Sequence, residues 1–111
     1  MENLHDRRKI YEKLQLIENE IKQNPFEQFR DWFIEATENP SVSESNAMAV
    51  STIEDDCCPR TRMVLLKSYS HEGFVFYTNY NSRKGKSIEK THKACLHFFW
   101  PSLERQIIIK A

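Results

Sequence analysis

Residues 62–78 read RMVLLKSYSHEGFVFYT, and this stretch decides the fold. The apolar run Arg62–Tyr69, with charged residues near its ends, predicts a β-strand. Ser70–Gly73 has the composition of a hairpin turn, and Phe74–Thr78 predicts the returning strand. We therefore expect a β-hairpin at the centre of the chain.

Further strands are predicted on both sides of this hairpin. Ala47–Ile53 precedes it, and a turn at Asp55–Pro59 joins the two. Ala94–Trp100 and Arg105–Lys110 follow it and are joined by a turn at Pro101-Ser102. Strands in hairpin pairs favour an antiparallel sheet that curls toward a small barrel.

Three helices are also predicted, so the expected class is mostly β with flanking helices. An apolar stripe at helical spacing predicts a helix over residues 6–23. A second helix begins at Pro25, with Asn24 as its N-cap, carries an aromatic face and ends at Asn39-Pro40. A short third helix is expected over about 83–91. We expect an N-terminal helical segment over 1–40 and a sheet domain over 41–111.

The composition is that of a soluble protein, with 40% hydrophobic and 29% charged residues. No apolar run approaches the roughly 20 residues of a membrane helix, and the N-terminus carries no apolar signal segment, so we expect a cytoplasmic protein without a membrane partner. Three cysteines, with Cys57 and Cys58 adjacent, favour free thiols in a reducing compartment. Their spacing does not suit a metal site.

A net charge of zero conceals a strong asymmetry along the chain. Residues 1–59 carry 6 basic and 13 acidic side chains, whereas residues 60–93 carry 8 basic and 2 acidic ones. A basic segment inside a neutral chain indicates a local anion-binding site more than an extended surface for nucleic acid.

The stretch YTNYNSRKGK, residues 77–86, indicates where an anion would bind. Ser82 is placed to cap a helix, and Arg83 and Lys84 follow in its first turn, where cations are ordinarily unfavourable. A phosphate bound at the helix N-terminus removes that conflict. The alternative is that the basic side chains at the start of this helix face solvent and bind no anion.

Other candidate residues are weaker when taken singly. Arg62 and Lys67 are five apart, so on a regular strand they point to opposite faces and need a bulge, or different parts of one ligand, to act together. Tyr77-Thr78 adds a ring and a hydroxyl near the same rim, and the amide of Gln106 can both donate and accept.

Taken in order, RMVLLK, GFVFYTNYNSRKGK and FFWPSLERQ resemble the pyridoxamine 5'-phosphate oxidase family. The resemblance covers about residues 47–111, and PFEQFRDWF, residues 25–33, resembles the helix that precedes the barrel in that family. It implies an FMN-binding split β-barrel, truncated here at the C-terminus because the family continues well beyond Ala111. It also implies a homodimer with the flavin at the subunit interface.

The resemblance implies the following FMN-binding residues: Arg62, Lys67, Tyr77, Thr78, Ser82, Arg83, Lys84 and Gln106. Lys67 is also expected near the phosphate of the substrate. Arg8 and Tyr11 resemble an Arg-x-x-Tyr pattern that some members fold over the active site, although an ordinary charged helix face explains the pair equally well. No catalytic residue is assigned, because the family's remaining substrate-binding residues fall in the part that this chain lacks.

The implied reaction is oxidation of pyridoxamine or pyridoxine 5'-phosphate to pyridoxal 5'-phosphate, with hydride passing to FMN and then to O2 to give H2O2. One alternative is a split-barrel protein that holds FMN or pyridoxal phosphate without turnover. Another is a nucleic-acid module that uses the basic segment and nearby aromatics. The zero net charge and the acidic N-terminal half argue against the nucleic-acid module.

Overall fold

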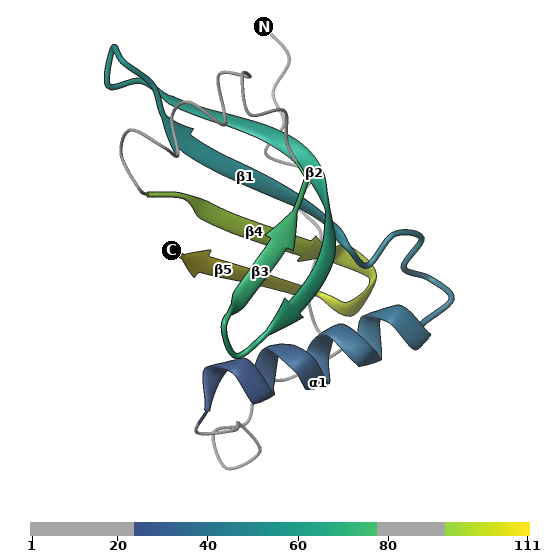
Figure 1. The fold of residues 1–111 in the computed structure, drawn as a ribbon. Helices are drawn as coiled ribbons and strands as arrows, with labels where there is room; N and C mark the ends of the chain where they lie inside the picture. Colours follow the sequence, from purple (N-terminus) through teal and green to yellow (C-terminus); the bar gives the residue numbers. More distant parts are fainter. Residues whose placement is uncertain (1–23, 78–92) are drawn as a thin grey trace, which may run out of the picture.

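The computed structural model describes residues 24–77 and 93–111 (Figure 1). Its elements are α1 (Pro25–Glu38), β1 (Ala47–Ile53), β2 (Pro59–Ser70), β3 (Gly73–Phe76), β4 (Cys95–Trp100), a short 3-10 helix (Pro101–Leu103) and β5 (Arg105–Lys110). The predicted N-cap is confirmed, because Asn24 Oδ1 accepts a hydrogen bond from the Phe26 backbone N–H at 2.9 Å. The helices predicted over 6–23 and 83–91 lie outside the described residues.

The strands form one antiparallel sheet in the order β3-β2-β1-β4-β5. The predicted hairpin pairs are confirmed, although β2 is longer than expected and already begins at Pro59. The pairing of β1 with β4 joins strands β3, β2 and β1 to the β4–β5 hairpin, with Val50 opposite Leu96. The structure therefore has the predicted fold class, a mostly antiparallel β-sheet with a helix.

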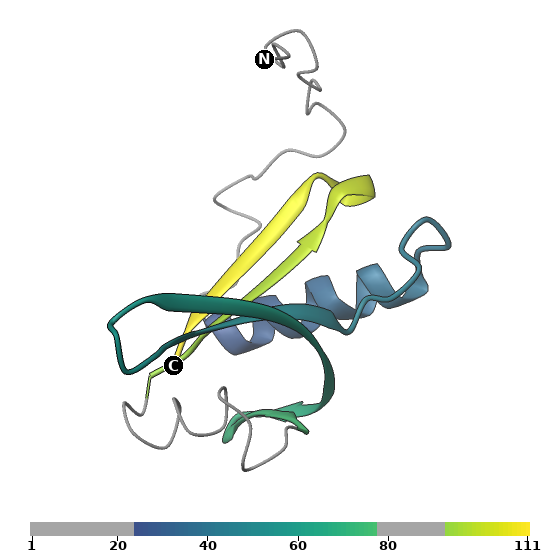
Figure 2. The same cartoon turned by 90° about the horizontal axis from the view of Figure 1, so that it is seen from above.

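A β-bulge at Lys67 bends β2. Leu66 pairs with Phe76 and Ser68 pairs with Val75, so β2 has one residue more than β3 at this point. Asn46 holds the bend from the other side, since its carbonyl accepts from the Leu66 N–H at 2.8 Å and its Nδ2 donates to the Leu66 carbonyl at 3.1 Å. Beyond the bulge, β2 curves and carries β3 away from β1, β4 and β5 (Figure 2).

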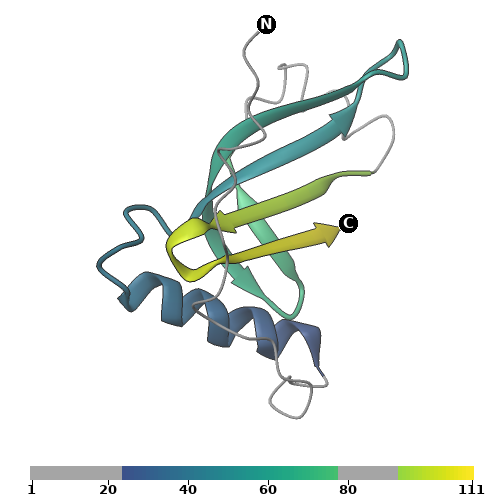
Figure 3. The same ribbon diagram turned by 180° about the vertical axis from the view of Figure 1, so that it is seen from behind.

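Helix α1 lies across one end of the curled sheet (Figure 3). Its aromatic face packs on the concave side, which we call the inner face, and Phe29 and Ala36 are buried there. The strands alternate accordingly: the buried residues of β1 are Met48, Val50 and Thr52, and those of β4 are Leu96, Phe98 and Trp100. We call the opposite, convex side the outer face.

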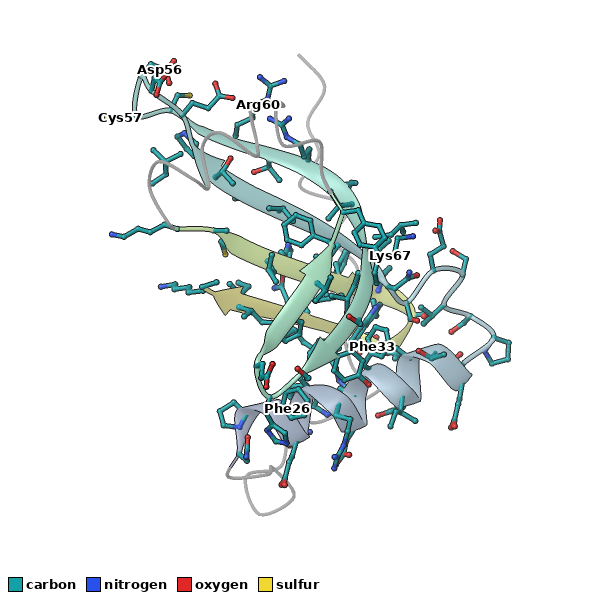
Figure 4. All side chains as sticks on the ribbon, in the orientation of Figure 1. Phe26, Phe33, Asp56, Cys57, Arg60 and Lys67 are labelled. Carbon is teal, nitrogen blue, oxygen red and sulfur yellow. The ribbon has the colours of Figure 1, made fainter. Side chains whose placement is uncertain are left out.

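The turn between β1 and β2 lies at the end of the sheet away from α1, as the labelled Asp56 and Cys57 show (Figure 4). Cys57 has a φ of 63°, in the left-handed region that residues with a Cβ rarely adopt. Its N–H donates to the Glu54 carbonyl at 2.9 Å, and the Cys58 N–H donates to Asp56 Oδ1 at 2.9 Å. These bonds hold the unfavourable conformation in place.

Replacing Cys57 by Gly should therefore stabilise the chain. The left-handed conformation costs a residue with a Cβ about 1–2 kcal/mol, and the greater backbone entropy of unfolded Gly offsets part of this gain, leaving about 0.5–1 kcal/mol. Thermal unfolding should show a higher Tm for Cys57→Gly than for Cys57→Ala, which also removes the thiol but keeps the Cβ. Equal Tm values for the two variants would show that the turn is not strained.

Candidate functional site

The inner face becomes polar toward the β1–β2 turn. Val50 faces Arg62 across the two strands, and Thr52 faces Arg60, so these side chains share the face that elsewhere forms the core. Arg60 lies in this region, well away from α1 (Figure 4). We call the group formed by Thr52, Arg62 and the adjacent Glu54 and Arg60 the polar corner.

Arg62 carries unpartnered donors in the polar corner. Its Nε and Nη2 atoms are buried and have no hydrogen-bond partner among residues 24–77 and 93–111, although the side chain as a whole keeps 26% of its surface exposed. Its Nη2 lies 3.9 Å from Glu54 Oε1, while Arg60 Nη1 holds the same oxygen at 3.2 Å. A buried donor without a partner costs about 1–3 kcal/mol, and Nε with Nη2 forms an edge that matches two oxygens of one anion.

Lys67 and Tyr77 lie at the same end of the paired segment of β2 and β3, the end away from the connecting turn. Lys67 is the bulged residue and is exposed (Figure 4). Tyr77 follows β3 directly and is 76% exposed. The bulge that the sequence required for Arg62 and Lys67 to act together is present, but Lys67 itself faces solvent.

Gln106 lies on the outer face of β5, opposite Phe99 of β4. Its Oε1 accepts a hydrogen bond from His97 Nε2 at 2.8 Å, which fixes the amide and leaves its NH2 group directed elsewhere. Both residues line a shallow pocket of about 420 Å³ together with Phe99, Glu104 and Arg105. Gln106 is thus a polar group on the outer face that is ordered by its contact with His97.

The structure does not bring the predicted flavin contacts together within one copy of the chain. Arg62 lies on the inner face of β2, whereas Gln106 lies on the outer face of β5, and β1 and β4 separate the two strands. An apolar cavity of about 470 Å³ between α1, the β2–β3 turn and β5 is lined by Phe29, Trp32 and Ile109 among others. None of the predicted FMN-binding residues lines this cavity, so its position does not identify the site.

Several predicted site residues lie outside the described residues, namely Arg8, Tyr11, Thr78, Ser82, Arg83 and Lys84. Within residues 24–77 and 93–111, no group of three or more His, Cys, Asp or Glu side chains could hold a metal ion. In the same ranges no helix is both long enough and apolar enough to cross a membrane. All three cysteines are free thiols.

The fold and the position of these residues can be compared with known proteins. The family model for pyridoxamine 5'-phosphate oxidase matches residues 34–111. The chain belongs to the pyridoxamine 5'-phosphate oxidase family. Membership accounts for the motif order in the sequence, and the five-stranded sheet is the part of the family's split barrel that this chain forms.

Curated relatives in this family match almost the whole chain. A pyridoxine/pyridoxamine 5'-phosphate oxidase of Flavobacterium johnsoniae is 52% identical over 99% of this chain and 51% of its own length. One of Neisseria gonorrhoeae is 45% identical over 97% of this chain and 51% of its own length. The chain therefore spans about half the length of the curated relatives that it matches.

Solved structures show the same fold. PhzG from Burkholderia lata, in complex with tetrahydrophenazine-1-carboxylic acid, superimposes with a TM-score of 0.81 at 25% identity over 89% of this chain and 49% of that one. A pyridoxamine 5'-phosphate oxidase-related, FMN-binding protein of Nostoc punctiforme gives a TM-score of 0.67 at 16% identity over 79% of this chain and 46% of that one. The second likeness supports the fold alone.

Sequence reasoning missed two residues of the site, Thr52 and His97. Thr52 occupies an inward position in the alternating strand β1, after Met48 and Val50, and a polar residue at such a position was a usable signal. His97 could not be connected with Gln106 from sequence, because their contact depends on the register between β4 and β5.

Proposed function

We propose that the chain binds FMN and forms the flavin-binding part of an enzyme that oxidises pyridoxamine or pyridoxine 5'-phosphate to pyridoxal 5'-phosphate. Family membership supports the reaction class, and the relatives' names indicate the substrates. The observation that carries the proposal is the pair of buried, unpartnered donors on Arg62, since an anionic ligand would supply the acceptors that the described residues do not.

The residues present fit a flavin mononucleotide. The Nε and Nη2 edge of Arg62 suits a phosphate, and the predicted cations Arg83 and Lys84 would add charge to the same group. The amide of Gln106, held by His97, would face the polar edge of the ring. When bound, FMN would accept hydride from the substrate and pass the electrons to O2 to form H2O2.

The contribution of the chain to this reaction is binding and orientation. Lys67 is exposed beside the bulge, so its ammonium group is free to meet the phosphate of the substrate, and Arg8 and Tyr11 are the proposed residues that close over it. The bulge fixes where the Lys67 side chain leaves the sheet, because the Asn46 bonds pin the neighbouring Leu66. Tyr77 and Thr78 would lie against the flavin from the end of β3.

We propose further that the working form is a homodimer. Arg62 and Gln106 lie on opposite faces of the sheet, so a flavin that contacts both would take them from two copies of the chain. The outer face offers a surface for such a contact, since Met63, Ala49, His97 and Ile108 form one row across β2, β1, β4 and β5. Met63 is 67% exposed and Ile108 is 60% exposed.

Replacing Arg62 should weaken FMN binding. Arg62→Lys keeps the charge but removes the two-donor edge, and we expect at least a tenfold loss of affinity, because hydrogen bonds to charged groups contribute about 1.5–3 kcal/mol each. The measurement is a titration followed by the visible absorption of flavin. Arg60→Lys is the matched control, since Arg60 lies on the same face of β2 but already pairs with Glu54.

The same titration tests the function as a whole. If the wild-type chain binds flavin and Arg62→Lys binds it equally tightly, the assignment of Arg62 is contradicted. A chain that binds no flavin would contradict the proposed function. Bound flavin without peroxide production from pyridoxamine 5'-phosphate would favour the alternative, a protein that holds the cofactor without turnover.

Charge placed on the outer face should disrupt the dimer. Ile108→Lys puts an ammonium group in the apolar row, and light scattering should show a shift from dimer to monomer relative to the wild type. Ile34→Lys is the control, because Ile34 is also exposed but lies on α1, away from the outer face. A wild-type chain that is monomeric at micromolar concentration, or a dimer unaffected by Ile108→Lys, would refute this arrangement.

A further inference from the structure

Thr52 is a buried polar residue with no partner in the part of the chain that the structure describes. It is 2% exposed, and its Oγ1 atom makes no hydrogen bond. A threonine on the outer face behaves differently, since the Thr61 hydroxyl lies 2.7 Å from Ser51 Oγ. A hydroxyl kept in a core without an acceptor or donor calls for a ligand.

The strand register places Thr52 beside the unpartnered edge of Arg62. Thr52 faces Arg60 and Arg62 faces Val50, so Thr52 and Arg62 are diagonal neighbours on the inner face. Three unpartnered polar atoms, Thr52 Oγ1 and Arg62 Nε and Nη2, therefore gather in the polar corner. Each of the three can donate a hydrogen bond.

We propose that the Thr52 hydroxyl is the third donor of an oxyanion site whose other two donors are Nε and Nη2 of Arg62, and that this site binds the phosphate of FMN. The inference rests on the proposed function. Two phosphate oxygens suit the guanidinium edge, and a third can accept from the hydroxyl.

The charges of the polar corner agree with an anionic ligand. Glu54 Oε1 lies 3.9 Å from Arg62 Nη2, but it is hydrogen-bonded to Arg60 Nη1 at 3.2 Å. Two guanidinium groups against one carboxylate leave a net positive charge. Glu54 is therefore within ion-pair distance of Arg62 Nη2 but makes no hydrogen bond to the edge of Arg62 that the phosphate would use.

Thr52→Val tests this proposal, because it removes the hydroxyl and keeps the branched shape. Without ligand, we expect its Tm to equal or exceed that of the wild type, since the lost hydroxyl had no partner. Its FMN affinity should fall about tenfold, the effect of one hydrogen bond to a charged group. Thr52→Ser should restore affinity to within about threefold, and Thr61→Val, on the outer face, should leave it unchanged.

Riboflavin has the same ring as FMN but lacks the phosphate, so it shows which of these two groups Thr52 recognises. Thr52→Val should weaken FMN and leave the weaker riboflavin binding unaltered; equal losses for both ligands would overturn the assignment to the phosphate. A lower Tm of the ligand-free variant would overturn it too, by showing that the hydroxyl bonds within the protein. Normal FMN affinity in Thr52→Val overturns this inference alone, whereas a wild-type chain that binds no FMN overturns the proposed function with it.

Discussion

The packing of Phe29 between the β2–β3 hairpin and β4 is the contact on which the rest of the structure depends. Its ring lies 5.4 Å from Tyr69 and 5.0 Å from Phe74 in the β2–β3 hairpin, and 5.2 Å from Phe98 in β4. These distances are typical of edge-on and tilted aromatic pairs. Because β3 and β4 are not neighbours in the sheet, Phe29 bridges separate parts of the curl, and Phe33 adds a second bridge between Tyr69 and Phe98. The polar corner lies at the other end of the same face, away from this apolar cluster.

The bulge at Lys67 links that packing to the site. One additional residue in β2 lets the strand pair with β1 over its first half and then turn toward β3, where Tyr69 meets Phe29. The same residue changes the alternation, so Leu66 and Tyr69 both face inward although they are three residues apart. A regular strand would point either Leu66 or Tyr69 to solvent. The residue proposed to meet the substrate is therefore the one that shapes the barrel.

Local signals made much of this fold predictable. Asn24-Pro25, the turn residues at 70–73 and the apolar runs fixed α1 and the hairpins to within a few residues. The pairing of β1 with β4 could not be predicted from local pattern, because no short turn connects them. The same limit applied to the site. Arg62 and Gln106 stand out by motif, but their placement on opposite faces depends on the strand register, and no motif singles out Thr52.

In the proposed function, the two faces of the sheet divide the work of binding. The inner face is apolar and aromatic near α1 and becomes cationic near the β1–β2 turn, where buried donors lack partners within the described part of the chain. The outer face is lined by Ala47 and Ala49 at its centre, with Gln106 oriented by His97 toward one edge. Small residues let another surface approach closely, and an oriented amide is useful only where a ligand arrives from that side. A second copy packed on the outer face would satisfy both conditions, since its Arg62 would hold one end of a flavin whose ring reaches this Gln106.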